Sequence, residues 1–505
     1  MSGSILDLSR RSAPARDVDV LVIGSGCGGA TAAWALAEAG REVLVLEEGA
    51  DLTGPALTGR DRPMYDQLYM DRGGRATDDL AISVLQGRAL GGGGVINASD
   101  VVPIPDGVLA HWRSRFDLGE LTERALAPYR ERALSDLSAS RIADGQLNEA
   151  NRLLRQGAEA LGLRGEIMMH NRVGCAGFGT CLIGCPLDAK RNPRFVAVPG
   201  ALAAGADVWL RARAVRIEDG ELARVTVRAL DPRGYAERGE ITVRARTVIL
   251  AANAVGSAQL LLRSGLGNAH VGRNLMLQPQ LPVVALFDHE VRAFRGIPQA
   301  YAVTEHERED HPEHGLHGFR IEAIMGTPGI VASMMPFVGR DNPAMMRSYD
   351  RIAAALLLVP DLPSGRVELH PDGRPKIVYA HRAEHLARVR EAVRVAARVY
   401  LAAGAREVLV PTARPLRIRS TRDLSLVDDL DLRPACAPFI SAHQQGTLRM
   451  APSADDGATD PDGLVYGTRA IYALDSSLFP SSASSHTMAP ILTVARYQAD
   501  KLAAA

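Results

Sequence analysis

Residues 18–49 read VDVLVIGSGCGGATAAWALAEAGREVLVLEEG. An apolar run at 18–23 leads into a glycine-rich turn, a stretch of small residues continues to Gly40, and a second apolar run follows at 42–46. Apolar runs of this length next to glycine are typical of buried strands, and small residues between them fit a helix that packs closely on those strands. The stretch therefore predicts a complete strand–helix–strand (βαβ) unit.

The glycines of this unit have the spacing of a dinucleotide-binding turn. In the pattern Gly24-x-Gly26-x-x-Gly29, the first glycine permits a tight turn, the second lets the backbone approach a pyrophosphate, and the third lets helix and strand pack closely. Glu47 lies 23 residues after Gly24, where a carboxylate can accept both ribose hydroxyls and would repel a 2′-phosphate. We therefore predict a dinucleotide other than NADP, and the unit leaves FAD and NAD open.

Composition limits the classes of protein that fit. The chain has 505 residues and 47% hydrophobic content, enough for two or three domains with substantial cores. Lys+Arg and Asp+Glu balance at 58 each, so charge does not favour nucleic acid or an anionic membrane as partner. Five cysteines form no disulfide framework, no apolar run follows Arg10-Arg11, and the charge-free stretches are too short for a membrane span. We predict a cytoplasmic protein that binds neither nucleic acid nor membrane.

A second glycine-rich segment, residues 86–97, reads QGRALGGGGVIN. Four consecutive glycines favour neither helix nor strand, and they expose backbone N–H groups that can line a polar or anionic ligand. Apolar residues on both sides, Leu90 and Val95-Ile96, argue against a flexible linker, which is usually flanked by polar sequence. We therefore expect this segment to contact the ligand.

Coming soon after GxGxxG, this second segment resembles the first signature of the glucose-methanol-choline (GMC) flavoprotein oxidoreductases. The resemblance implies FAD rather than NAD. It also implies that the glycines and Asn97 lie against the isoalloxazine and the pyrophosphate. Members with a covalent flavin carry His just before that Asn, whereas Ile96 stands here, so the resemblance implies non-covalent FAD. The glycines concerned are Gly91, Gly92 and Gly93.

Residues 251–267, AANAVGSAQLLLRSGLG, are similar to the second signature of the same family. They depart from it at Asn253, where Gly or Ser is usual, and at Ala258, where Pro or Ser is usual. In the family this strand and helix close the nucleotide domain. The residue that matches Val215 contacts the adenine through its backbone.

The sequence pattern changes at about residue 281. Short strands and turns follow, with one long helix predicted at 382–403. This part resembles the family's substrate domain, an antiparallel sheet laid over the flavin. The predicted fold is therefore α/β: a Rossmann-like FAD-binding domain of the non-contiguous segments 1–280 and 436–505, with an inserted α+β substrate domain at 281–435.

Three of the five cysteines, Cys175, Cys181 and Cys185, lie close together in the sequence. Thiolates at such spacing can bind an iron–sulfur cluster or zinc, although no fourth ligand is nearby. The spacing resembles a branch of sugar dehydrogenases in the family that carry a three-iron cluster and pass electrons to a cytochrome. Many soluble relatives have a similar loop without a known cluster. We expect a packed loop without metal and keep the cluster as the alternative.

The C-terminal 65 residues contain the groups for chemistry. SAHQQGTLRM at 441–450 and the segment 472–486 match the family's closing pattern. Oxidising an alcohol requires loss of a hydroxyl proton and a hydride, and an imidazole can take the proton. The resemblance places that base at His443, a group that aligns the substrate oxygen at His486, and a flavin contact near the ribityl and pyrophosphate groups at Asp475.

The predicted function is FAD-dependent oxidation of a primary or secondary alcohol to a carbonyl. His443 would remove the proton, the hydride would pass to flavin N5, and O2 or another acceptor would reoxidise the flavin. Two alternatives use the same scaffold: a non-redox lyase similar to hydroxynitrile lyases, and an iron–sulfur dehydrogenase subunit that feeds a cytochrome. The sequence does not identify the alcohol.

Overall fold

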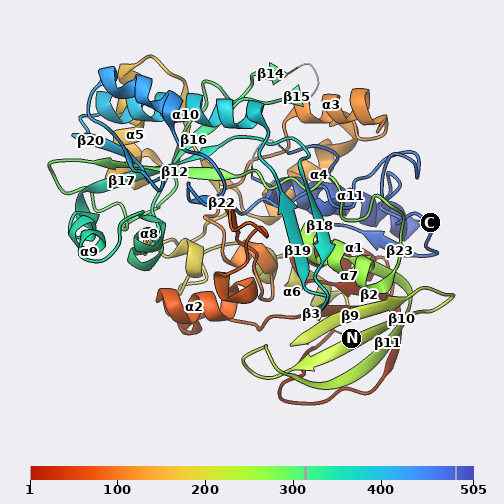
Figure 1. The fold of residues 1–505 in the computed structure, drawn as a ribbon. Helices are drawn as coiled ribbons and strands as arrows, with labels where there is room; N and C mark the ends of the chain where they lie inside the picture. Colours follow the sequence, from red (N-terminus) through yellow and green to blue (C-terminus); the bar gives the residue numbers. More distant parts are fainter. Residues whose placement is uncertain (1, 312–314, 484–485, 505) are drawn as a thin grey trace.

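Two β-sheets organise the chain in the computed structural model, which describes residues 2–311, 315–483 and 486–504 (Figure 1). In strand order, the first sheet contains β1 (Ile5–Asp7), β8 (Asp207–Leu210), β3 (Val43–Glu47), β2 (Arg16–Ile23), β11 (Glu237–Leu250), β10 (Ala223–Leu230) and β9 (Ala212–Glu218), and β23 (Ile471–Ala473) pairs with β11. The second contains β21 (Leu416–Ile418), β20 (Glu407–Val410), β12 (Gln280–Leu286), β17 (Ile352–Leu358), β16 (Arg320–Ile324), β13 (Tyr301–Val303) and β6 (Gly165–Ile167), and β22 (Phe439–Ser441) pairs with β12 and with β4 (Ile82–Val84).

The predicted βαβ unit lies within the first sheet. Strands β2 and β3 pair in parallel, with Ile23 opposite Leu46, and α1 (Cys27–Glu38) connects them. Small residues let this helix approach the strands closely: a Cβ atom on Gly29 would lie 1.9 Å from the carbonyl oxygen of Gly24. Gly29 therefore serves helix–strand packing, as its place in the motif predicts.

A layer of helices packs around α1. Helix α1 contacts α6 (Ala197–Ala203) and the C-terminal helix α11 (Met488–Ala504). Helix α11 in turn contacts α4 (Glu123–Asp136). Helix α4 begins after Thr122, whose hydroxyl accepts a hydrogen bond from the N–H of Ala125 at 3.0 Å and so satisfies an otherwise unpaired donor. Within the described part of the chain, no helix is long and apolar enough to cross a membrane.

The second sheet is antiparallel over β12, β17 and β16. Helices pack against these strands, and alternate residues of the same strands line a cavity. Helices α5 (Glu149–Ala160) and α10 (Ala383–Ala402) pack against these strands, as can be followed in Figure 1. Because side chains alternate between the faces of a strand, every second residue points the other way. These alternate residues line a cavity: they are Gln280, Pro282 and Val284 on β12, Ile352, Ala354 and Leu356 on β17, and Ile324 on β16.

The predicted architecture, a Rossmann-like unit with an inserted part that carries an antiparallel sheet, is confirmed. The second sheet takes most of its strands from 281–435. It also includes β4 and β6, which precede that segment, and β22, which follows it. The division into 1–280 with 436–505 and 281–435 stays a proposal, and these strands cross its boundaries.

Candidate active site

A cavity of about 1660 Å³ lies where the two sheets approach each other. Its wall includes the carboxyl ends of β2 and β3, the glycine-rich segment at 92–94, and the alternate residues of β12 and β17 described above. Pockets for drug-sized ligands usually measure about 300–1,000 Å³. This cavity therefore has room for a dinucleotide together with a second small molecule.

At one end of the cavity two glycine-rich turns meet. Gly24 has φ +103°, and a Cβ atom there would lie 2.3 Å from the carbonyl oxygen of Ala251. Gly26 lines the cavity, and the nearest heavy atom to a Cβ on it is Gly92 Cα, 3.9 Å away. A Cβ on Gly92 would in turn lie 2.7 Å from Gly26 Cα. Backbone thus forms a cradle here that side chains would fill. We call it the nucleotide end.

Glu47 ends β3 at this place, as predicted. Its side chain is buried, with Oε2 accepting from the Ser25 hydroxyl at 2.5 Å and Oε1 accepting from the N–H of Gly49 at 2.7 Å. Burial raises the pKa of the Glu47 carboxyl. Oε2 also accepts from the N–H of Ser25 at 3.1 Å, whereas Oε1 keeps a further lone pair that can accept a hydrogen bond from a ligand in the cavity.

The other predicted cofactor residues divide into two groups. Gly92, Gly93, Asn97 and Asp475 line the cavity. The Asp475 carboxylate is fixed by the Ser257 hydroxyl and the N–H of Ser477, both at 2.8 Å, and burial raises its pKa. Gly91, Gly29 and Val215 do not belong to the lining described. Gly91 donates its N–H to the Ser25 hydroxyl at 3.1 Å, and Val215 lies in β9 next to Ala214, which does line the cavity.

His443 follows β22 and lies on the cavity wall with 8% of its surface exposed. Its Nδ1 lies 2.5 Å from Gln278 Oε1 and 3.2 Å from Gln280 Nε2. Burial lowers the pKa of His443 to about 3, and the neighbouring His486 adds to the effect. The imidazole is therefore neutral at physiological pH.

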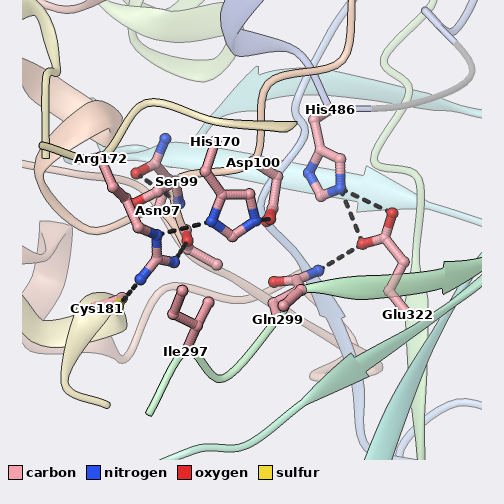
Figure 2. Close-up of polar contacts among 12 residues, drawn as sticks. Asn97, Ser99, Asp100, His170, Arg172, Cys181, Ile297, Gln299, Glu322 and His486 are labelled. Atoms are coloured by element: carbon pink, nitrogen blue, oxygen red, sulfur yellow. Dashed lines mark hydrogen bonds and ion pairs between the residues drawn. The ribbon is translucent and has the colours of Figure 1, made fainter. Parts of the chain in front are cut away.

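His486 lies just before α11, and its ring centroid is 5.2 Å from that of His443. Its Nε2 lies 2.9 Å and 3.1 Å from the two carboxylate oxygens of Glu322, which is fully buried on β16 (Figure 2). Burial lowers the pKa of His486, but the carboxylates of Glu322 and Asp100 together raise it above its ordinary value. In return, His486 and Arg320 hold the pKa of Glu322 well below its usual range despite burial. The cavity thus contains two neighbouring imidazoles whose pKa values are shifted in opposite directions.

Two segments of the chain match models of a known family. Residues 65–280 match the N-terminal and residues 361–495 the C-terminal model of GMC oxidoreductases, and residues 22–81 match a NAD(P)-binding Rossmann-like domain. The chain belongs to the GMC oxidoreductase family. This confirms the family predicted from the glycine-rich segments and the closing histidine pattern.

Curated relatives of this GMC oxidoreductase include proteins with and without an assigned activity. An uncharacterized GMC-type oxidoreductase of Mycobacterium tuberculosis is 32% identical over 508 residues, which cover 98% of this chain and 77% of that protein. The long-chain-alcohol oxidase FAO4B of Arabidopsis thaliana is 28% identical over 502 residues, which cover 94% of this chain and 66% of that protein.

Solved structures support the fold. Formate oxidase of Aspergillus oryzae RIB40, in a variant studied for its effect on FAD modification, matches with a TM-score of 0.73 and 17% identity over 98% of this chain and 99% of that one. Pyridoxine 4-oxidase of Mesorbium loti matches with a TM-score of 0.70 and 17% identity over 96% of this chain and 99% of that one. At this identity the likeness shows the shared architecture alone.

Membership in the GMC family implies FAD as the cofactor, and the residues at the nucleotide end fit it. A Cβ atom at Gly93 would meet no heavy atom within 4 Å, and one at Gly26 would meet only backbone at van der Waals distance. The cradle is therefore open to a ligand on its cavity side. Glu47 and Asp475 offer buried carboxylate oxygens on the same wall.

The cysteine-rich loop of this GMC oxidoreductase carries free thiols. The Arg172 guanidinium lies 3.3 Å from Cys181 Sγ and 3.9 Å from Cys175 Sγ. In the part of the chain that the structure describes, two groups have three metal-ligand atoms within 4.8 Å of one another, and neither includes a cysteine. Whether this loop holds a cluster stays a proposal.

Sequence reasoning missed five side chains around the two histidines. Glu322 and its neighbour Arg320 are charged residues in a strand that is otherwise apolar, and this pattern in RIEAI was the signal that could have found them. Gln278 contacts Nδ1 of His443 through its amide oxygen, and Gln280 lies beside the same nitrogen. Asp100 lines the cavity and follows the glycine-rich segment, but nothing in its local sequence distinguishes it.

Proposed function

We propose that this GMC oxidoreductase oxidises the hydroxyl group of an apolar alcohol to a carbonyl group. The observation that carries the proposal is a pair of imidazoles, 5.2 Å apart, in the cavity that also contains the glycine cradle, with His486 held by the Glu322 carboxylate. Alcohol oxidation requires removal of a hydroxyl proton and of a hydride. The two imidazoles supply the groups that handle the proton and the charge on oxygen.

The nucleotide end is proposed to hold FAD. Glu47 would accept the ribose hydroxyls, the backbone at Gly26 and Gly92 would contact the pyrophosphate, and Asp475 would lie by the ribityl group. When bound, FAD supplies the hydride acceptor at its N5 atom. We propose non-covalent binding, because Ile96 stands where covalent relatives carry their linking histidine.

His443 is proposed to remove the hydroxyl proton. Its Nδ1–H donates to Gln278 Oε1 at 2.5 Å, which leaves the lone pair on Nε2. A pKa of about 3 keeps this nitrogen unprotonated, but it also makes His443 a weak base. The proton transfer therefore depends on stabilisation of the negative charge that develops on the substrate oxygen.

His486 is proposed to supply that stabilisation. Its Nε2–H is held by Glu322, so the Nδ1–H of the imidazolium is left to donate to the substrate oxygen. A charged donor in a buried cavity stabilises a developing alkoxide far more than the same donor in water. His443 and His486 thus act on one oxygen, one as base and the other as cation.

The substrate is proposed to be an alcohol with an apolar chain. Beyond the histidines, the cavity wall is lined by aliphatic and methionine side chains, which favour burial of hydrocarbon. The relatives described as long-chain-alcohol oxidases support this class. The residues concerned are Ile324, Ile330, Val331, Met334, Met335, Ile352, Ala354 and Leu356.

The test is an anaerobic absorbance titration of the purified protein with primary alcohols from ethanol to tetradecanol, with iron assayed on the same sample. We expect the flavin bands to bleach, at lower concentrations for longer alcohols. Bound flavin that no alcohol bleaches would instead support the lyase alternative, and stoichiometric iron the dehydrogenase subunit. Admission of air, with peroxide measured, then distinguishes O2 from another acceptor.

Other predictions from the sequence stay proposals. They are a cytoplasmic location, the absence of nucleic acid and membrane partners, and the adenine contact at Val215. Arg213 and Ala214, which line the cavity next to Val215, support a nucleotide contact at this strand.

A further inference from the structure

A second buried carboxylate, that of Asp100, lies on the cavity wall close to His486. One oxygen of Asp100, one of Glu322 and a ring nitrogen of His486 all lie within 4.8 Å of one another. The Asp100 side chain is 3% exposed and the Glu322 side chain 0%. Figure 2 shows the imidazole of His486 between the two acids.

Asp100 is held from behind by His170. The two residues are opposite each other in an isolated β-bridge, and His170 Nε2 lies 2.7 Å from Asp100 Oδ1. Arg172 donates from Nε to His170 Nδ1 at 2.7 Å, and because a guanidinium is always a donor, Nδ1 is an acceptor. The single proton of His170 is therefore on Nε2, facing Asp100. Burial lowers the pKa of His170, which favours the neutral imidazole.

Several charged groups surround His486 and its partner Glu322. Glu322 is shared, because Arg320 donates from Nε to its Oε1 at 2.9 Å while His486 contacts both oxygens. Arg320 also pairs with Glu307 at 2.8 Å and with Glu166 at 3.3 Å, so three carboxylates share its charge. The other ionisable groups near His486 are the imidazoles of His443 and His170 and the carboxylate of Asp100.

The same three ligand atoms could hold a divalent cation, but the chain already supplies the positive charge. Glu322 accepts from Arg320, Gln299 and His486. Asp100 has the His170 imidazole, with the Arg172 guanidinium behind it, on one side and His486 on the other. The arrangement is therefore that of two carboxylates around one imidazole.

We propose that Asp100 is a positioning residue that, oriented by His170, keeps His486 in its cationic form and so maintains a charged N–H donor for the substrate oxygen. Opposite charge within about 4–6 Å favours the charged form of a titrating group. Asp100 provides such a charge in addition to that of Glu322, which contacts Nε2. The role in catalysis rests on the proposed function, whereas the charge state of His486 is a property of the chain alone.

The test compares Asp100→Asn with the wild-type holoenzyme. We expect the midpoint of the alkaline limb of kcat/KM, where His486 loses its proton, to fall by at least about one pH unit. The His486 ring titration, followed by NMR on histidine-labelled protein and assigned by its loss in His486→Asn, should fall by the same amount. Asp100→Glu should restore most of both. An Asp100→Asn enzyme with both midpoints unchanged would overturn the proposal.

Glu407→Gln is the matched control. Glu407 is a buried carboxylate on β20 that pairs with Arg417 and Arg419 and does not line the cavity. Its loss removes the same charge and should leave both midpoints in place. Should Asp100→Asn not fold, His170→Phe removes the imidazole that contacts Asp100 at 2.7 Å and should move the midpoints in the same direction. Unmoved midpoints there overturn the proposal.

The two readouts separate this proposal from the proposed function. If the wild type oxidises no alcohol, the proposed function fails, and the NMR titration still decides whether Asp100 sets the charge of His486. If the wild type oxidises alcohols and the His486 titration is the same in Asp100→Asn, only the role of Asp100 fails.

Discussion

The two ends of the cavity differ in the groups that form them: backbone at the nucleotide end, and side chains around His443 and His486 at the other, which we call the histidine end. At the nucleotide end, backbone approaches backbone, and a Cβ atom on Gly92 would lie only 2.7 Å from Gly26 Cα. At the histidine end, the acting groups are side chains that come from distant segments, with Glu322 on β16 and His443 after β22. The first end is therefore sensitive to added volume, and the second to changes of charge. Variants at each end should fail in different ways.

The largest effect is expected from added volume at the nucleotide end. Gly92→Val would place side-chain atoms against Gly26 at a residue with φ +56°, a conformation that favours glycine. We expect a folded protein that has lost its bound flavin and hence all activity, measured by the flavin absorbance per protein. Gly119→Val, where a Cβ meets no heavy atom within 4 Å, is the control and should keep its flavin. A folded Gly92→Val protein with a full complement of flavin would show that the two turns do not form the cradle.

At the histidine end, loss of the base should spare the cofactor and slow the chemistry. His443→Ala removes the proposed proton acceptor, and we expect flavin reduction by alcohol to be slower by at least about 10²-fold. Stopped-flow absorbance under anaerobic conditions measures this rate, and flavin content should stay at the wild-type value. His289→Ala changes an exposed imidazole and serves as control. A wild-type reduction rate in His443→Ala would refute the assignment of the base.

The same contrast explains how much the sequence could reveal. The βαβ unit and its glycines are contiguous, and each residue type there follows from a local requirement such as the φ of +103° at Gly24. The family resemblance then placed His443 and His486, which the structure brings into one cavity. Local pattern and motif thus predicted the fold class and the two histidines.

The partners of those histidines could not be found in this way. Glu322 reaches His486 across a separation of 164 residues, and Gln278 reaches His443 across 165. Such contacts depend on which strands become neighbours in the second sheet, and its order follows no local rule. Strand alternation alone places Glu322 on the cavity face, but only once that face is known.

A smaller effect is expected on the free energy of unfolding at acid pH, and it arises from two histidines at the start of helix α10. His381 and His385 stack with ring centroids 5.4 Å apart, and burial lowers their pKa values to about 4 and about 3. Because these values lie below that of an unfolded histidine, the unfolded chain takes up protons first as pH falls below about 6.5. Stability is therefore complete above that pH and is lost as pH falls toward the folded values.

His385→Phe removes one of the two imidazoles that take up a proton on unfolding, and so tests this pH dependence. Each histidine that protonates only on unfolding contributes a slope of about 1.4 kcal/mol per pH unit. Urea unfolding between pH 6 and pH 4 should therefore show a shallower loss of stability in His385→Phe, by up to about that slope. The exposed His289→Phe is the control. Equal slopes in His385→Phe and wild type would contradict the burial of a neutral imidazole at this site.

The smallest effect concerns the apolar wall and uses the alternation of β17 as its own control. Leu356 lines the cavity, while Leu357 is fully buried and is not part of the cavity lining. Leu356→Ala removes contact with the alkyl chain, so KM for a long alcohol should rise about fivefold, equivalent to about 1 kcal/mol, with kcat unchanged and little effect on ethanol. Leu357→Ala should lower the free energy of unfolding by about 2–5 kcal/mol, as core truncations do, without changing the ratio of KM values. Steady-state kinetics across the alcohol series and urea unfolding measure both. If the two variants change the ratio of KM for the long alcohol to KM for ethanol equally, the preference for long alcohols reflects general loosening of the sheet rather than a wall that contacts substrate.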